Sequence, residues 1–230
     1  MQPEGLADIV TSVHDYVRYL QRLGLTELPL RPVVQQPRRP ETARVSAADR
    51  LQELAASVHD CRKCRLHQGR THVVFGTGNP NADLVFIGEA PGYDEDVQGE
   101  PFVGRAGQLL TRIIEAMGLR REHVYILNII KCRPPENRNP LPDELAACRP
   151  ILEAQLACLQ PRVICALGTF AAQALLQTEE RITRLRGRLH QMGNIQVMPT
   201  YHPAYLLRNP QAKRAVWDDV QQIQRLLGLR

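Results

Sequence analysis

Apolar segments of two kinds alternate along most of this chain. Four short runs are rich in β-branched residues, which is typical of buried strands, and they lie at 83–88, 123–130, 162–168 and 195–200. Between and after them, apolar residues recur at helical spacing in longer segments, at 104–117, 142–159, 169–176 and 211–227. This alternation predicts an α/β fold, namely a three-layer α/β/α sandwich with a central four-stranded parallel sheet.

The carboxyl ends of the predicted strands are the expected place for a functional site. Ligands of parallel sheets bind outside those ends, so the segments after residues 88, 128, 168 and 200 should lie together. The unusual sequence of the chain is concentrated in these segments. We therefore look for chemistry there.

The first 45 residues differ from the rest. Apolar residues at helical spacing in 6–24 predict one amphipathic helix, and the proline-rich stretch after it predicts an extended linker. We place the boundary near Val45, with the helix and linker in 1–45 and one main domain in 46–230. On its amphipathic character alone, the helix is a candidate contact for a protein partner.

Composition narrows the class of protein. With 43% hydrophobic and 23% charged residues, the chain has the balance of a globular protein, and its net charge of +5 suits a polyanionic partner. No apolar run approaches the length of a membrane span, and the N-terminus lacks the pattern of a signal peptide. We expect a cytoplasmic monomer that has no contact with a membrane.

The cysteines are candidate metal ligands, because disulfides are rare in a reducing compartment. Cys61 and Cys64 form a C-x2-C pair in a polar, basic segment, and fifteen residues separate Cys132 from Cys148. Four thiolates suit either zinc or a 4Fe-4S cluster. The second pair lacks the tight spacing of zinc ribbons, so we favour iron-sulfur and keep zinc as the alternative. The other two cysteines, Cys158 and Cys165, stand in apolar segments and are expected in the core.

The loop after the first predicted strand, GEAPGYDEDVQGEPFVGRAGQLL, stands where phosphate-binding loops occur. It has no G-K-[ST] motif, which argues against nucleotide binding. Its five carboxylates would ordinarily belong to a solvated loop; they are Glu89, Asp94, Glu95, Asp96 and Glu100. Phe102, between glycines in this polar segment, is not explained by that interpretation.

Four motifs stand at the predicted site: GEAPGYDEDVQGEPFVGRAG, NIIKCRPPENRNP, ALGTFAAQALL and YHPAYLLRNP. With the cysteines at their spacings, they closely resemble the family 4, iron-sulfur uracil-DNA glycosylases, from about Ala47 to the C-terminus. The resemblance implies the fold of that family, a 4Fe-4S cluster on the four cysteines and a base-excision-repair enzyme. Such an enzyme hydrolyses uracil from double- or single-stranded DNA and leaves an abasic site.

The resemblance also implies a uracil pocket, since a glycosylase must flip its base out of the duplex. Phe102 would stack on the base, and Asn128 would hydrogen-bond its edge to exclude cytosine. An amide suits this role because it donates to a carbonyl while it accepts from a ring N–H. Glu95 would crowd C5 and reject the thymine methyl, and Gly88 and Pro91 complete the substrate-binding set.

For catalysis, the resemblance implies that His202 donates to the uracil oxygen as negative charge develops on the base. Better-known uracil glycosylases carry an aspartate where this chain has Ala90, so the usual carboxylate that positions water is absent. Glu89 is our candidate for that task. The backbone around Ala90 and Pro91 is the competing candidate.

The predicted DNA contacts are of two types. In YHPAYLLRNP, the resemblance implies an apolar wedge with an adjacent phosphate contact, formed by Tyr205, Leu207 and Arg208. Phosphate contacts are also expected from a helix N-terminus at Gly168 and Thr169. The arginine run RITRLRGRLH, which includes Arg186, is expected to contact phosphates as well.

Two other functions stay open from the sequence. Related uracil-DNA binders capture their target covalently, but they carry a basic KRRIH insertion where this chain has CRPPENRNP, so turnover is favoured. The other alternative is a non-enzymatic nucleic-acid module that binds zinc through its cysteines. In that case the acidic loop would be purely structural.

Overall fold

The computed structural model describes residues 46–229 together with residues 11, 14 and 18. Apart from those three residues, the predicted N-terminal helix and linker lie outside the described residues. The described residues from 46 onward belong to one compact unit. None of the helices in the described residues is long and apolar enough to cross a bilayer.

The centre of the fold is a six-stranded sheet in the order β1-β3-β2-β4-β6-β5. The four inner strands are parallel and match the four predicted runs; they are β2 (Leu84–Gly88), β3 (Tyr125–Asn128), β4 (Val163–Leu167) and β6 (Ile195–Thr200). The sheet gains two antiparallel edge strands that the sequence did not predict, β1 (Thr77–Gly78) and β5 (His190–Met192). At two and three residues, they are too short to show a period.

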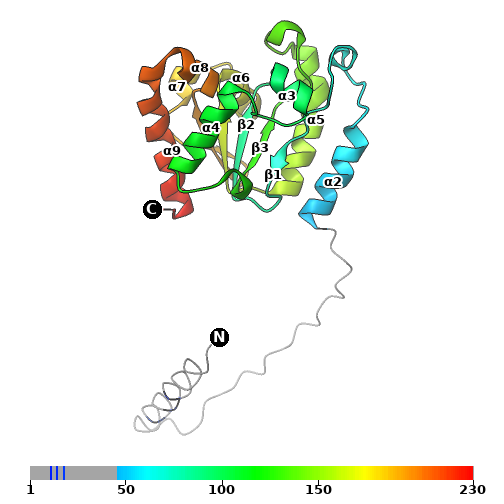
Figure 1. The fold of residues 1–230 in the computed structure, drawn as a ribbon. Coiled ribbons are helices and arrows are strands. Elements are labelled where there is room, and N and C mark those ends of the chain that lie inside the picture. Colours follow the sequence, from blue (N-terminus) through cyan, green and yellow to red (C-terminus); the bar gives the residue numbers. More distant parts are fainter. Residues whose placement is uncertain (1–10, 12–13, 15–17, 19–45, 230) are drawn as a thin grey trace. The chain divides into compact units, whose positions relative to one another are not determined.

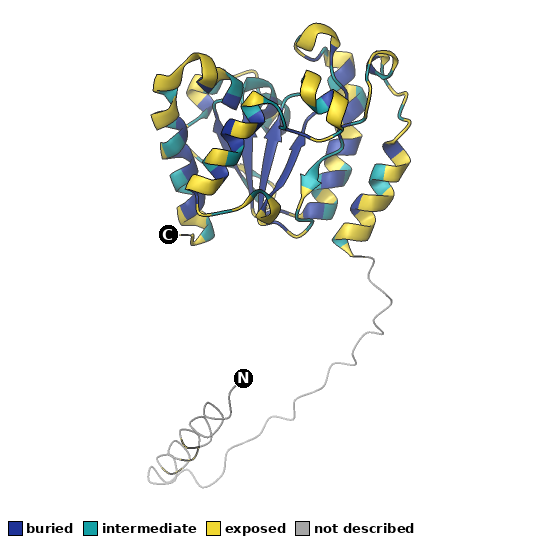
Figure 2. Ribbon diagram, in the orientation of Figure 1, coloured by how far each residue is buried: buried dark blue, intermediate teal, exposed yellow. Residues whose placement is uncertain are grey.

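Helices cover both faces of the sheet, as predicted (Figure 1). Alternate side chains of β2 enter two separate cores, Leu84 and Phe86 on one face, Val85 and Ile87 on the other. The first core is closed by α4 (Arg105–Ala116) and α9 (Lys213–Leu227), and the second by α2 (Ala47–Val58), α5 (Pro142–Leu159) and α6 (Thr169–Leu176). Figure 2 shows the inner strands buried between these layers.

The remaining elements are short. They are the α-helices α3 (Tyr93–Gln98), α7 (Ile182–Leu185) and α8 (Pro203–Arg208) and the 3-10 helices η1 (Arg65–Gln68), η2 (Arg121–His123), η3 (Pro135–Asn137) and η4 (Pro210–Ala212). The sequence predicts a helix at none of them except η4, which overlaps the start of the predicted last helix. A single helical turn has too few positions to show helical spacing.

The inner strands end together. Gly88 of β2 pairs with Asn128 of β3, and Leu167 of β4 pairs with Thr200 of β6. Between these pairs, Ile87 of β2 pairs with Ala166 of β4. The loops after these strands therefore meet at one edge of the sheet, as the parallel arrangement predicts.

Candidate active site

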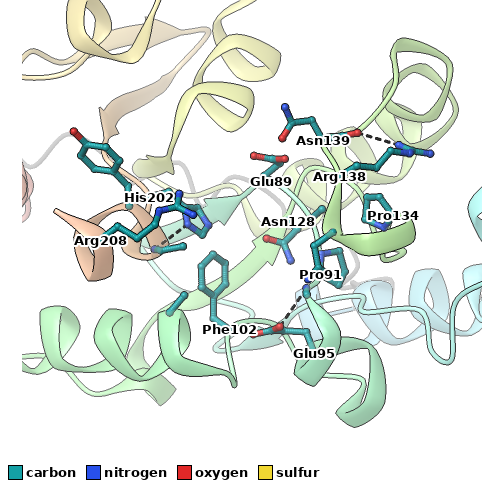
Figure 3. Close-up of a pocket in the computed structure, with 16 residues that line it drawn as sticks. Glu89, Pro91, Glu95, Phe102, Asn128, Pro134, Arg138, Asn139, His202 and Arg208 are labelled. Atoms are coloured by element: carbon teal, nitrogen blue, oxygen red, sulfur yellow. Dashed lines mark hydrogen bonds between the residues drawn. The ribbon is translucent and has the colours of Figure 1, made fainter.

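A cavity of about 500 Å³ opens at this edge (Figure 3). Its lining includes most of the predicted site residues, namely Glu89, Ala90, Pro91, Glu95, Phe102, Asn128, His202, Tyr205 and Arg208. They come from the loops after β2 and β3 and from the segment after β6. The structure thus brings together residues that are far apart in the sequence.

The aromatic ring of Phe102 is held in the cavity wall by glycines. Phe102 has a left-handed φ of 54° and is 6% exposed. A Cβ on Gly107 would lie 1.8 Å from the Phe102 carbonyl oxygen, and one on Gly88 would lie 2.4 Å from Phe102 Cζ. Only glycine leaves room at both positions. A bulky residue with positive φ is uncommon and is typical of functional sites.

The carboxylate of Glu95 organises the same loop. It accepts hydrogen bonds from the N–H groups of Gly92 at 3.1 Å and of Val103 and Gly104 at 3.0 Å each. These bonds tie the start of α3 to the turn that follows Phe102. The acidic loop is therefore not simply solvated, although the sequence alone favoured that interpretation.

Asn128 ends β3 with its side chain at the cavity and is only 1% exposed. Its Oδ1 atom has no hydrogen-bond partner among the described residues. A Cβ on Gly88 would come within 2.4 Å of this oxygen, so glycine is needed here as well. A buried acceptor without a partner is costly, and a ligand N–H would satisfy it.

His202 packs against Phe102, with ring centroids 5.5 Å apart, and both side chains line the cavity. Its Nδ1 accepts a hydrogen bond from the Ala204 N–H at 3.1 Å, so the ring proton of the neutral form is on Nε2. Burial, assisted by the charge of Arg208, lowers the pKa of His202 to about 4. The imidazole is therefore a neutral donor at physiological pH.

Glu89 follows β2 directly and is half-buried in the cavity wall. Burial raises the pKa of its carboxyl to about 7. A carboxylate with a pKa near the working pH is suited to accept a proton from water. The neighbouring Ala90 lines the cavity and also packs on the core cluster that includes Cys132 and Cys148.

The four candidate ligands line a second cavity, which they share with basic residues. These cysteines are Cys61, Cys64, Cys132 and Cys148. Burial raises the pKa of Cys132 to about 11 and also raises that of Cys148. In the described part of the chain, no group of three or more His, Cys, Asp or Glu side chains is placed to hold a single metal ion. Four thiols without oxygen ligands are nonetheless the donor set of an iron-sulfur cluster.

The remaining cysteines lie elsewhere. Cys165 is fully buried in β4, and Cys158 packs on the second core from α5. The prediction as a small buried residue is confirmed for Cys165, whereas Cys158 is only partly buried.

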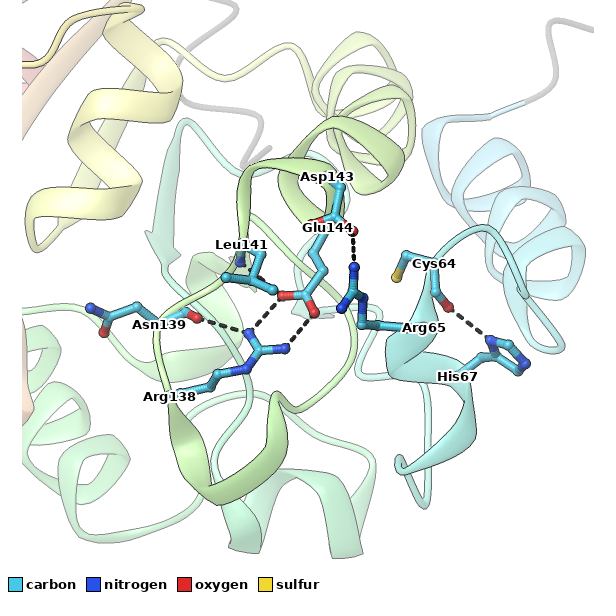
Figure 4. Close-up of polar contacts among 8 residues, drawn as sticks. All are labelled: Cys64, Arg65, His67, Arg138, Asn139, Leu141, Asp143 and Glu144. Carbon is cyan, nitrogen blue, oxygen red and sulfur yellow. Dashed lines mark hydrogen bonds and ion pairs between the residues drawn. The ribbon is translucent and has the colours of Figure 1, made fainter.

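Two ion pairs support the segments that carry the cysteines (Figure 4). Arg138 binds the fully buried carboxylate of Glu144 through two nitrogens, at 2.6 and 2.8 Å. Arg65, next to Cys64, binds Asp143 at 2.9 Å. The first pair fixes the loop after β3 to the start of α5, and the second fixes the C-x2-C segment to the same helix.

Comparisons with known proteins agree with this geometry. Residues 75–221 match the model of the uracil DNA glycosylase superfamily. The chain is 44% identical to the type-4 uracil-DNA glycosylase of Archaeoglobus fulgidus, over 77% of this chain and 94% of that protein. It is 46% identical to the type-4 enzyme of Thermotoga maritima, over 76% of this chain and 93% of that one. This chain belongs to the type-4 uracil-DNA glycosylases.

In this type-4 uracil-DNA glycosylase, the candidate DNA contacts form a rim beside the cavity. Tyr205 and Leu207 on α8 are 39% and 37% exposed, and Arg208 ends the same helix. Gly168, with φ of 91°, precedes Thr169 at the start of α6. A Cβ on Gly168 would lie 3.1 Å from the Cβ of His202, so this turn lies against the catalytic candidate.

The sequence missed one side of the cavity. Pro134, Asn137, Arg138 and Asn139 line it from the loop that follows Cys132. The signal was present, because this segment belongs to a motif that begins at Asn128, but its residue types alone do not show which of them face a ligand.

Arg186 has partners inside the protein. Its guanidinium binds the fully buried Asp219 at 2.7 and 3.1 Å and the carbonyl oxygen of Ala215 at 2.6 Å. The group also lies over the ring of Tyr201 at 5.2 Å. These contacts join α7 to α9, which is a structural role that the arginine run did not indicate.

We expect Arg186→Leu to lower the free energy of unfolding by about 3 kcal/mol, because it leaves the Asp219 carboxylate buried without its partner. Urea unfolding measures this change. Arg184→Leu, on an exposed arginine of the same segment, is the control and should have little effect. Wild-type stability together with weakened DNA binding would instead assign Arg186 to phosphate contact.

Proposed function

We propose that this chain is a monofunctional uracil-DNA glycosylase of base excision repair. It flips uracil out of DNA, hydrolyses the N-glycosidic bond and leaves an abasic site. The observation that carries this proposal is the unpaired Asn128 Oδ1 in a cavity that also holds the Phe102 ring and a neutral His202. A flat base with an N–H on its edge and a carbonyl oxygen meets all three groups. Membership of the family supports the same conclusion.

Uracil recognition follows from these groups. The ring of Phe102 provides a stacking surface, and Asn128 Oδ1 accepts the N–H of the base while the amide nitrogen donates to a carbonyl. Cytosine lacks that N–H and would leave the buried oxygen unpaired, which disfavours it. Glu95 would restrict the space beside C5; the three backbone N–H groups that hold its carboxylate support this role.

Bond cleavage leaves negative charge on the uracil and positive charge on the sugar. The Nε2–H of His202 donates to the uracil oxygen more strongly as this charge grows, which lowers the barrier. Glu89 positions the attacking water and accepts its proton. The backbone at Ala90 and Pro91 is the alternative group for holding the water.

The DNA is held at the rim of the cavity. Leu207 and Tyr205 fill the space that the flipped base leaves, and Arg208 contacts a phosphate. The N-terminus of α6, at Gly168 and Thr169, binds a second phosphate. These contacts position the duplex and do not read its sequence.

We also propose that the four cysteines hold a 4Fe-4S cluster. They line one cavity, and each thiolate of such a cluster binds a different iron, so the four need not converge on one point as they would around zinc. Metal binding displaces the thiol protons that burial retains. The cluster would supply a rigid link between the C-x2-C segment and the loop that begins after Asn128.

Excision from a uracil-containing oligonucleotide, followed by alkaline cleavage at abasic sites, tests the enzyme. We expect strand breaks at uracil and none at thymine or cytosine. A protein-DNA adduct that survives denaturation, without turnover, would support the covalent binder instead. Absence of both from folded protein would overturn the proposal.

A further inference from the structure

Lys131 is a fully buried lysine that lies between the cysteine cavity and the backbone of Asn128. It is 1% exposed, and it stands between the uracil-reading candidate Asn128 and the ligand candidate Cys132. Its Nζ donates a hydrogen bond to the backbone carbonyl oxygen of Asn128 at 2.6 Å. The same side chain lines the cysteine cavity. One residue therefore touches both the loop that reads the base and the site proposed for the cluster.

The ammonium group of Lys131 lacks a carboxylate partner. Among the described residues, none of the ion pairs includes it. An ammonium has three donors, and the carbonyl oxygen of Asn128 satisfies one of them. Burying such a charge without an opposite charge is strongly unfavourable. The negative charge has to come from the cavity side.

The cysteines supply that charge. Lys131 shares its cavity with all four cysteines, and a cysteine that binds a metal does so as the negatively charged thiolate. A cluster held by four thiolates carries a net negative charge. Among the described residues, Lys131 is the one buried ammonium beside the cysteines. Arg70 approaches from a different segment, where its Nη1 donates to Cys132 Sγ at 3.2 Å and to the Cys61 carbonyl oxygen at 2.7 Å. In the described residues, the hydrogen bonds of Arg70 reach Cys61, Cys132 and His59 and none reaches Asn128, which distinguishes Arg70 from Lys131.

We propose that Lys131 is a positioning residue that acts as the buried counter-charge of the cluster and holds the backbone of Asn128 in place for reading uracil. The inference rests on the proposed cluster and glycosylase activity. It explains how a group outside the active-site cavity affects excision. Without the cluster the ammonium has no opposite charge, so its charge-assisted bond to the Asn128 carbonyl oxygen weakens and the uracil-binding amide is held less firmly.

Lys131→Met tests both halves, because it keeps the length of the side chain and removes its charge. Lys63→Met is the matched control: Lys63 lines the same cavity but is exposed to water. For Lys131→Met we expect loss of iron to a chelator about tenfold faster and single-turnover excision about tenfold slower, with DNA affinity unchanged. The reduction potential of the cluster should fall, because a nearby positive charge favours the more negative, reduced state.

A purely structural role of Lys131 would leave the reduction potential unchanged. Lys63→Met should not change the rate of iron loss, the excision rate or the reduction potential. Wild-type potential, iron loss and excision in Lys131→Met would overturn the inference while the cluster and the activity stand. A wild-type chain that carries no iron would overturn it together with the proposed cofactor.

A second variant keeps the positive charge at this position. Lys131→Arg retains a cation beside the cysteine cavity, so its reduction potential should stay near that of the wild type even where its excision rate differs. A reduction potential that falls as far in Lys131→Arg as in Lys131→Met would contradict the role of Lys131 as counter-charge.

Discussion

His202→Ala is expected to slow uracil excision by about 10²–10³-fold, the cost of removing one donor from a site of developing negative charge. DNA affinity should stay close to that of the wild type, because the bond strengthens only as the glycosidic bond breaks. The donor is the neutral imidazole, whose Nδ1 is occupied by the Ala204 N–H. Single-turnover excision and an equilibrium binding assay separate the two effects.

The pH dependence distinguishes this neutral donor from an imidazolium. In the Glu89→Gln variant, where the titration of Glu89 is absent, the remaining excision should show no loss near pH 6.5, where an ordinary histidine titrates, because the pKa of His202 is about 4. His123→Ala is the control, since His123 is exposed and lies beyond the opposite ends of the strands. Thermal unfolding checks that loss of the Phe102 contact has not unfolded the variant. An excision rate equal to that of the wild type would remove His202 from the mechanism.

Glu89→Gln is expected to lower kcat/KM by about 10²–10⁴-fold, the usual range for loss of a general base. Only the ionised carboxylate accepts a proton from water, and burial holds its pKa at about 7. The wild-type kcat/KM should therefore rise with pH up to about 7 and level off above it. The glutamine variant should lack this dependence.

Glu100→Gln is the matched control, because Glu100 is an exposed carboxylate of the same loop that does not line the cavity. Stability provides a second check. Since the pKa of Glu89 is raised in the folded state, the folded chain retains this proton between about 4.5 and 7, and the group costs stability as pH rises through that window. Glu89→Gln should therefore be at least as stable as the wild type at neutral pH. Unchanged kcat/KM would leave the backbone at Ala90 and Pro91 to position the water.

The regular elements of the fold were predictable because their patterns repeat. The helices at 142–159 and 169–176 have the predicted bounds, and the four buried strands lie within their apolar runs. Most elements that the sequence analysis did not predict have too few residues to repeat a pattern. The exception is α2, whose twelve residues are enough to show helical spacing. β1 depends on pairing with β3, which is distant in the chain, whereas β5 pairs with the next strand, β6, across a two-residue turn; periodicity reveals neither pairing.

The residue types of the candidate site were set by the sequence alone: a phenylalanine, an asparagine, a histidine, an acidic loop and four cysteines. The tertiary structure decided how these groups are used. It left Asn128 Oδ1 unpaired, set the proton of His202 on Nε2, engaged Glu95 with backbone and paired Arg186 with Asp219. It also buried Lys131 between the cysteine cavity and the backbone of Asn128. Hydrogen-bond partners, burial and pKa values depend on neighbours that are distant in the chain, and only the folded chain brings those neighbours together.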